Sequence, residues 1–199
     1  MNTLSDESTY RLLIFGATGT GATTLADILS DEVIDCPHVD LDDYLWLPSD
    51  PPYQKRRTLS EVHSIVLEDI RDFPAWIISG ASVAWLDELE AMIDLAVYLW
   101  LPSDLRIARL ERRELLKLGS ERIATGGDLH EQSQAFLQWA AQYDQGSLPG
   151  WDRKSHEQWI ERASCPVLRL EGDMPVAVRA DRVLLALHDL KEGRELHGR

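Results

Sequence analysis

Residues 10–25 read YRLLIFGATGTGATTL, and this stretch decides how the rest of the chain is interpreted. The apolar run 12–15 leads into a glycine-rich turn, and the turn runs directly into the helix-like segment TTLADILSDE. Gly16, Gly19 and Gly21 permit positive φ and let backbone N–H groups approach an anion closely. A helix that begins there adds free N–H groups and the positive end of its dipole. We therefore predict a strand, a phosphate-binding loop and a helix. The predicted nucleotide contacts are Gly16, Ala17, Thr18, Gly19, Thr20, Gly21, Ala22, Thr23 and Thr24.

One position of this loop departs from the phosphate-binding pattern. The spacing Gly16-x-x-x-x-Gly21-x-Thr23 fits the P-loop pattern, except that Ala22 stands where the pattern has lysine. Thr23 has the hydroxyl that ligates Mg²⁺ in such loops. The missing cation predicts weakened catalysis, or an arginine supplied from elsewhere in the chain. A plain turn between strand and helix is the structural alternative.

A dinucleotide-binding turn is a second functional interpretation of the same loop. An acid, Asp40, lies roughly 20 residues farther on, near the end of the next expected strand, as such folds require. The glycine spacing is G-x-x-G-x-G rather than G-x-G-x-x-G, so the match is loose. This alternative predicts an NAD(P)-dependent oxidoreductase.

Composition limits the classes of function. The chain has 199 residues, which is enough for one α/β domain and short for two. Its net charge of −14 disfavours a nucleic-acid partner, and binding of an anion requires loop amides, Mg²⁺ or clustered arginines. The start of the chain has no features of a signal peptide. The longest apolar run, 95–101, is too short to span a bilayer. We expect a cytoplasmic protein, monomer or homodimer, with no membrane partner.

The cysteines and two of the histidines are not expected to form a site. Cys36 and Cys165 are too few and too far apart for a disulfide framework or a metal centre, so both are predicted to be free thiols. His130 and His156 have no partner motif, and we predict that both are surface residues.

Strands and helices are expected to alternate along the chain. The expected strands are 10–15, 33–39, 76–78, 95–101 and 167–170. The expected helices are 23–32, 59–73, 87–92, 103–118, 128–143, 152–163 and 176–190. This alternation predicts one doubly wound parallel sheet with helices on both faces. Residues 113–150 would lie off the sheet as a helical excursion.

Acids follow the second expected strand. Asp40, Asp42 and Asp43 come at its carboxyl end, which is the ligand side of an open α/β sheet. Carboxylates there hold Mg²⁺ through water, or accept a proton from a hydroxyl group. A solvated acidic turn is the alternative.

A substrate subsite is expected beside these acids. Ser79 and Gly80 end the third strand and leave room for a ligand, and Trp85 either walls the pocket or fills the core. Arg56, in the cationic run 55–57, is a candidate for binding a substrate anion. A proline loop from 47 to 53 precedes that run.

The helix expected after the fourth strand carries a cationic face. Arg106, Arg109 and Arg113 share one side of it, and Arg112 is adjacent. Arginine suits bidentate contact with phosphate, so this face is a candidate clamp that replaces the charge missing at Ala22. A helix surface with local ion pairs is the alternative.

Over nearly its whole length the chain resembles the nucleoside, nucleotide and shikimate kinase group of P-loop proteins. The resemblance is carried by GATGTGATT at 16–24, DLDDY at 40–44, IISGAS at 77–82, YLWLPSDLRIARLERRE at 98–114 and LEGDMP at 170–175. More narrowly, the lysine-less loop with HVDLDDYLWLPSDPPYQKRR resembles uncharacterised bacterial P-loop proteins labelled adenylate-kinase-like or AAA-family ATPases.

The resemblance implies a three-layer α/β/α P-loop NTPase fold in a single domain. It implies sheet order 2-3-1-4-5, ATP on the first loop, and a lid at about 113–150 after the fourth strand. Thr23 and Asp40 would serve Mg²⁺, and Asp42 or Asp43 would be the base for an acceptor hydroxyl.

By the same resemblance, Arg109 and Arg113 match lid-side arginines, and Gly172 and Asp173 would lie near the adenine. The chain has no arginine between 72 and 105, which argues against a standard adenylate kinase. The implied function is transfer of the ATP γ-phosphoryl group to a hydroxyl or phosphate of a small acceptor. A non-catalytic nucleotide sensor is the other alternative.

Overall fold

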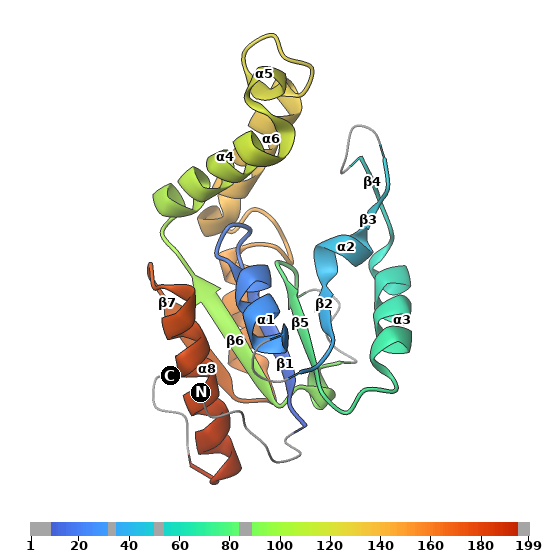
Figure 1. Ribbon diagram of the computed structural model, residues 1–199, viewed down its shortest axis with the longest axis vertical. Helices are drawn as coiled ribbons and strands as arrows, with labels where there is room; N and C mark the ends of the chain where they lie inside the picture. The colour runs from blue at the N-terminus through green and yellow to red at the C-terminus, as the bar shows by residue number, and fades with distance from the viewer. Residues whose placement is uncertain (1–8, 32–34, 50–53, 84–88, 195–199) are drawn as a thin grey trace.

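Five parallel strands form the central sheet of the protein (Figure 1). The computed structural model describes residues 9–31, 35–49, 54–83 and 89–194. In spatial order the strands are β2 (His38–Asp40), β5 (Trp76–Gly80), β1 (Arg11–Gly16), β6 (Leu95–Trp100) and β7 (Val167–Glu171). Numbered along the chain, these strands have the order 2-3-1-4-5, which confirms the predicted topology.

Helices cover both faces of this sheet, because β1 is apolar on both sides. Leu12 and Ile14 of β1 pack in one core cluster with residues of α1 (Ala22–Leu29) and α8 (Val176–Lys191). Leu13 and Phe15 point the opposite way, into a cluster with residues of α3 (Leu59–Ile70) and α7 (Arg153–Arg162). The continuous apolar run of the first strand therefore fills two cores at once, as expected for a buried parallel strand.

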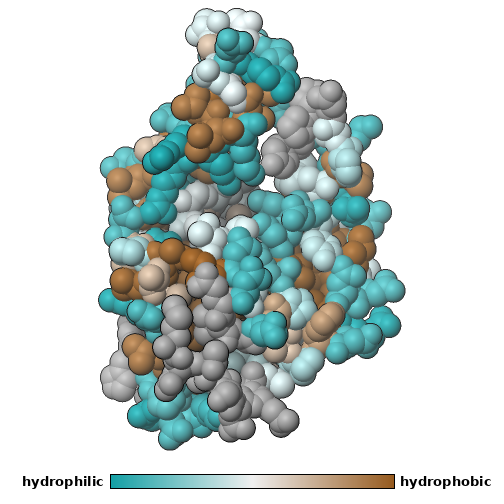
Figure 2. Space-filling view, viewed as in Figure 1, coloured by the Kyte–Doolittle hydropathy of each residue, from teal (hydrophilic) through white to brown (hydrophobic). Residues whose placement is uncertain are grey.

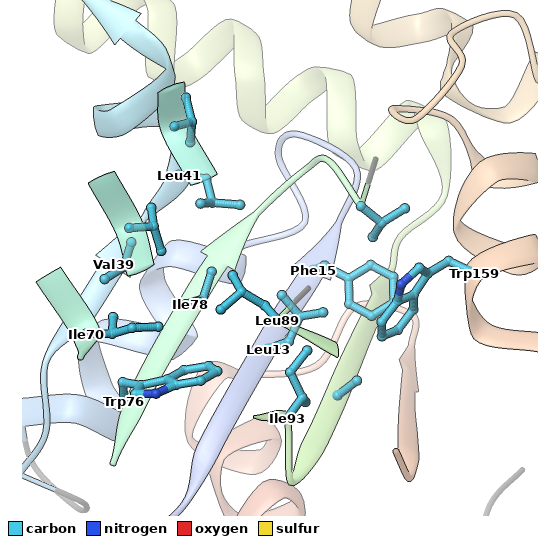
Figure 3. Packing of buried hydrophobic residues seen from close by; sticks show 14 of the residues in the cluster. Leu13, Phe15, Val39, Leu41, Ile70, Trp76, Ile78, Leu89, Ile93 and Trp159 are labelled. Atoms are coloured by element: carbon cyan, nitrogen blue, oxygen red, sulfur yellow. The ribbon is translucent and has the colours of Figure 1, made fainter. Parts of the chain in front are cut away.

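The second of these cores is built around aromatic rings. Figure 3 shows Phe15 of β1 with its ring directed at Trp159 of α7, and the two centroids are 5.1 Å apart at an interplanar angle of 76°. This edge-to-face contact fixes α7 against the sheet. The helix predicted for 59–73 is shorter, because α3 ends at Ile70, and Phe73 lies beyond the turn that follows and is 46% exposed.

The helix boundaries follow their end signals. Thr58 and Glu61 form a capping box at the start of α3. The long helix α4 (Ser103–Leu118) ends at Gly119, which has a φ of 87°. Asp152 caps α7 by accepting a hydrogen bond from the Ser155 amide. At these points local chemistry and the fold agree.

A helical segment projects from the carboxyl edge of the sheet (Figure 1, top). It comprises most of α4, then α5 (Ser120–Ile123), α6 (His130–Ala141) and the 3₁₀ helix η3 (Gln142–Gln145). This is the excursion predicted for 113–150. Across from it lie α2 (Leu41–Leu45) and the antiparallel pair β3 (Trp46–Leu47) and β4 (Lys55–Arg56).

Several elements differ from the prediction. The helix α2 and the β3–β4 pair were not predicted, because strands of two residues leave no periodic signal. Strand β2 begins at His38, five residues later than predicted, and residues 32–34 and 50–53 lie outside the described part. In place of the predicted helix 87–92 the described chain has the 3₁₀ helix η2 (Glu90–Met92).

The structure also bears on the cysteines and on membrane-spanning segments. Cys36 and Cys165 are free and partly buried, as predicted. Within the described ranges, no helix combines the length and apolarity needed to cross a bilayer.

Candidate functional site

A cavity of about 1130 Å³ opens at the carboxyl edge of the sheet. Its walls come from the glycine-rich loop, α2, the β3–β4 pair, α4, α6 and the start of α8. Figure 2 shows the surface notched between the helical segment at the top and the β3–β4 arm. The volume exceeds the roughly 300–1,000 Å³ of most small-molecule pockets, so there is room for two small ligands.

The glycine-rich loop forms one wall of this cavity. Gly19 and Gly21 have φ of 91° and 93°, which other residues rarely adopt. A Cβ at Gly16 would collide with the Leu99 carbonyl oxygen of the neighbouring strand. No side chain caps the first N–H groups of α1, so these donors remain available to a ligand. All nine predicted contacts, 16–24, line the cavity.

Arg179 of α8 supports this loop, and sequence reasoning missed it. Its Nη1 donates to the Thr20 carbonyl at 2.6 Å, and its Nη2 donates to the Gly172 carbonyl at 3.2 Å. The side chain is only 3% exposed, and its Nε finds no partner among the described residues. Burial and the nearby Arg109 lower its pKa. The sequence feature that could have identified Arg179 is its position three residues after Val176, which puts it on the buried face of an amphipathic helix.

The three acids lie together on a second wall. Asp40 caps α2 by accepting a hydrogen bond from the Asp42 amide at 3.0 Å, and Asp40, Asp42 and Asp43 all line the cavity. The side chain of Asp42 is exposed to the cavity. Its pKa is raised to about 6, first because the surrounding protein removes water from the carboxylate, and second because the negative charge of Asp40 lies nearby. In the described ranges no group of three acids, histidines or cysteines is arranged to hold a metal ion.

Cations of α4 form a third wall. Arg109 and Arg113 both line the cavity, and so does Lys117, which the sequence analysis did not select. Arg109 donates to Asp173 at 2.6 Å. The Arg113 guanidinium lies 5.6 Å from the centre of the Phe136 ring. Arg113 and Lys117 are close enough to Asp42 to oppose the rise in its pKa.

Arg106 does not belong to this cationic wall, so the predicted face is wrong at that position. It is completely buried, and its guanidinium donates to the Ala140 carbonyl at 2.9 Å and to Asp144 at 3.3 Å. It also lies over the Tyr143 ring, 5.1 Å from the centroid. Arg106 therefore ties α4 to α6 and η3. The prediction failed because a helix of mixed arginines gives no sign of which one is covered.

Replacing Arg106 by Met is expected to destabilise the protein by about 3 kcal/mol, because Asp144 and the Ala140 carbonyl lose a charged donor. Urea unfolding measures the change. Arg112→Met is the matched control, because Arg112 is exposed and forms no hydrogen bond or ion pair with a described residue. We expect that control to stay within about 0.5 kcal/mol of the wild type. Equal stability of the two variants would contradict the structural role of Arg106.

The predicted substrate contacts divide into two groups. Arg56 and Gly80 line the cavity. Ser79 does not, because it is fully buried and its hydroxyl lies 2.8 Å from His38 Nε2. Trp85 lies outside the described residues. Of the residues expected near an adenine, Gly172 accepts from Arg179 and Asp173 accepts from Arg109, and neither lines the cavity.

Ser79, His38 and Asp27 form a hydrogen-bonded chain. Both imidazole nitrogens are engaged, Nε2 by Ser79 at 2.8 Å and Nδ1 by Asp27 at 2.8 Å. The order of groups is that of a nucleophilic triad. However, Ser79 has 0% exposure and lines no part of the cavity, so no substrate reaches it. These hydrogen-bonded side chains link α1, β2 and β5 beneath the site.

His156 is a second buried histidine, and the prediction that it lies on the surface is wrong. It has 0% exposure, and burial lowers its pKa to about 4. Nε2 donates to the Ala81 carbonyl at 2.9 Å, so Nδ1 of the neutral ring accepts from Tyr143 at 2.9 Å. The Tyr98 hydroxyl lies 2.9 Å from that of Tyr143. This network fixes Ala81 at the cavity. His130 is half-buried, with Nδ1 2.9 Å from the Ile123 carbonyl.

Comparison with known proteins places this chain in a family. Residues 12–122 match the family described as AAA domain. The uncharacterized protein YqaC of Bacillus subtilis is 41% identical over 171 residues, which is 86% of this chain and 93% of that protein.

Two solved structures share the fold. The shikimate kinase of Acinetobacter baumannii, in complex with shikimate, matches with a TM-score of 0.54 and 16% identity over 93% of this chain and 96% of its own. A gluconokinase of Sinorhizobium meliloti matches with a TM-score of 0.55 and 13% identity over 92% of this chain and 94% of its own. At these identities the likeness concerns the fold. The chain belongs to the AAA-domain family and has the fold of the P-loop kinases.

Proposed function

We propose that the protein binds ATP with Mg²⁺ and is a kinase that transfers the γ-phosphoryl group to a small acceptor. The observation that carries this proposal is the meeting of three groups at one cavity. These are the open amides of the glycine-rich loop, the acids of α2 and the cations of α4. A phosphoryl-transfer site needs an anion cradle, a base and positive charge in this arrangement.

Loop 16–24 would hold the phosphates through its backbone N–H groups. The fit is supported by the positive φ of Gly19 and Gly21 and by the uncapped start of α1. Thr23, which also lines the cavity, would offer its hydroxyl to Mg²⁺, and Asp40 would contact the ion through water. When bound, Mg²⁺ offsets charge on the phosphate oxygens.

Positive charge would come from arginines in place of the lysine absent at position 22. Arg179 is held against the loop by two carbonyl groups, and neither neutralises it. Arg113 and Lys117 face the cavity and form no ion pair with any described residue. In a chain of net charge −14, cations that form no ion pair with a described residue are explained by an anionic ligand.

Asp42 would act as the base toward an acceptor hydroxyl. The acceptor oxygen forms a bond to the γ-phosphorus, the bond from that phosphorus to the β–γ bridging oxygen breaks, and Asp42 takes the hydroxyl proton. Residues 113–150 would serve as a lid in the single domain. They carry cavity residues from α4 and α6 and can exclude water on closing.

Calorimetric titration with ATP, with and without Mg²⁺, tests this proposal, and NADPH is the control ligand. We expect ATP binding that Mg²⁺ strengthens and no heat from NADPH. Binding of NADPH alone would favour the oxidoreductase alternative, although the sheet order 2-3-1-4-5 differs from the 3-2-1-4-5-6 order of dinucleotide folds.

Ala22 also favours a second candidate, a nucleotide sensor without catalysis. Phosphate release from ATP separates the two candidates. A sensor binds MgATP and releases no phosphate above the uncatalysed rate, whereas a kinase releases phosphate slowly to water.

A further inference from the structure

Aromatic side chains line the part of the cavity that lies away from the glycine-rich loop. Phe136 and Trp139 of α6 are stacked, with centroids 6.2 Å apart and an interplanar angle of 24°. Trp151 meets Trp139 edge-on at 6.2 Å and 67°. Trp46 of β3 lines the cavity as well. All four are partly exposed, so their rings offer surface to the cavity.

Trp46 and Trp151 pack against the core cluster around Phe15, but the other two aromatic residues are not explained by the hydrophobic core. Phe136 and Trp139 belong to neither of the two core clusters of the sheet. Leaving large apolar rings in contact with water costs free energy, roughly 25 cal/mol for each Å² of apolar surface. A patch of this kind inside a cavity is typical of a ligand-binding surface.

The aromatic wall begins beside the residues proposed for phosphoryl transfer. Arg113 lies over the Phe136 ring at 5.6 Å, and its charge acts on Asp42. A molecule that lies on Phe136 and Trp139 is therefore next to the carboxylate and the arginine. The phosphate loop forms another wall of the same cavity.

Arg56 supplies an anion contact at the cavity rim. It lies on β4, lines the cavity, is exposed and makes no ion pair with any described residue. Arg113 and Lys117 come from α4, whereas Arg56 comes from the β3–β4 arm. It therefore remains available to a second anionic ligand when the α4 cations contact the phosphates.

From this arrangement we propose that the acceptor is a small molecule with a flat aromatic ring, a hydroxyl group and a negatively charged substituent. Its ring would lie on Phe136, Trp139 and Trp151, its charge would face Arg56, and its hydroxyl would face Asp42. The proposal rests on the proposed kinase function and names the substrate class of that same site.

Three probe compounds test this class by calorimetric titration of the full chain. Para-(hydroxymethyl)benzoate has the flat ring, the hydroxyl and the charge. Trans-para-(hydroxymethyl)cyclohexanecarboxylate has the same groups on a puckered ring, and benzyl alcohol lacks the charge. We expect the flat acid to bind about tenfold more tightly than the puckered acid, because ring stacking is lost in the latter. We expect benzyl alcohol to bind about threefold to tenfold more weakly than the flat acid.

Titration of single-residue variants with the same probes identifies which residues cause the preference for the flat ring and which cause the preference for the charge. Trp139→Leu should remove most of the preference for the flat ring, and Arg56→Gln should remove the preference for the charged probe. Phe73→Leu is the control, because Phe73 is an exposed aromatic residue that does not line the cavity. Thermal unfolding of each variant verifies that it is folded.

Equal affinity for the flat and puckered acids would overturn the proposal. It would also be overturned by a preference that survives Trp139→Leu, or by no binding of the flat acid at tens of millimolar. Titration of the wild type with MgATP tests the kinase function independently of the probe compounds. Absence of ATP binding together with the expected probe ranking would refute the kinase function and leave the aromatic ligand class standing.

Discussion

Asp42→Asn is expected to lower the rate of phosphate release from MgATP by about 10²–10⁴-fold, the usual contribution of a general base. An amide keeps the size of the side chain and cannot take the hydroxyl proton. Affinity for MgATP should change by less than about threefold, because the proposed phosphate contacts are loop amides and arginines. Release of inorganic phosphate, with water as acceptor, gives the rate, and calorimetry gives the affinity.

Asp43→Asn is the matched control for Asp42. Both acids lie in the first turn of α2 and line the cavity, and Asp42 is the one whose raised pKa is opposed by Arg113 and Lys117. We expect Asp43→Asn to keep most of the activity. If Asp43→Asn abolished phosphate release and Asp42→Asn did not, the base would be Asp43.

Arg179→Gln is expected to weaken MgATP binding by about 10- to 100-fold. Two hydrogen bonds from the guanidinium hold the Thr20 and Gly172 carbonyls, and its charge lies beside the loop. Hydrogen bonds from charged groups are each worth about 1.5–3 kcal/mol, and part of that energy fixes the loop for its ligand. Arg182→Gln is the control, because Arg182 lies on the same helix, is exposed and forms no hydrogen bond or ion pair with a described residue.

The double variant Ala22→Lys with Arg179→Gln separates charge from structure. If Arg179 supplies the positive charge that the loop lacks, a lysine at position 22 should restore much of the lost affinity for ATP. If Arg179 only shapes the loop, the lysine will not restore affinity. If Arg179→Gln alone left the affinity for MgATP unchanged, Arg179 would not contribute to nucleotide binding by the loop.

The strand order and the glycine-rich loop between β1 and α1 could be predicted because their signals are local. The apolar run of β1 is continuous because the strand is buried on both faces. Gly19 and Gly21 are needed where φ is positive, and Gly119 ends α4 for the same reason. In these segments each residue choice reflects the backbone around it, so pattern and spacing are sufficient.

The supports of the site could not be predicted, because they depend on contacts between distant segments. Arg179 and Thr20 are 159 positions apart, and Arg106 reaches Ala140 across 34. His156 meets Ala81 across 75 positions. Nothing in the neighbouring residues marks which arginine or histidine will be covered. The phase of α8 could have indicated that Arg179 faces inward, but only the fold shows which carbonyl groups it binds.

The predicted site residues line the cavity where strand ends carry them to it, and they lie elsewhere where their side chains have other partners. The acids of α2 and Gly80 reach the cavity from the carboxyl ends of β2 and β5. Ser79 is one residue earlier on β5, and its side chain is therefore directed elsewhere, to His38. The aromatic wall was missed because Phe136 and Trp139 read equally well as core positions of a helix.

A crystal structure with Mg²⁺ and a non-hydrolysable ATP analogue tests the central claim most directly. The account predicts phosphate density enclosed by the amides of loop 16–24, with Mg²⁺ at the Thr23 hydroxyl and the γ-phosphate facing Asp42 and Arg113. A nucleotide bound elsewhere, or a loop that stays empty at saturating analogue, would contradict the account.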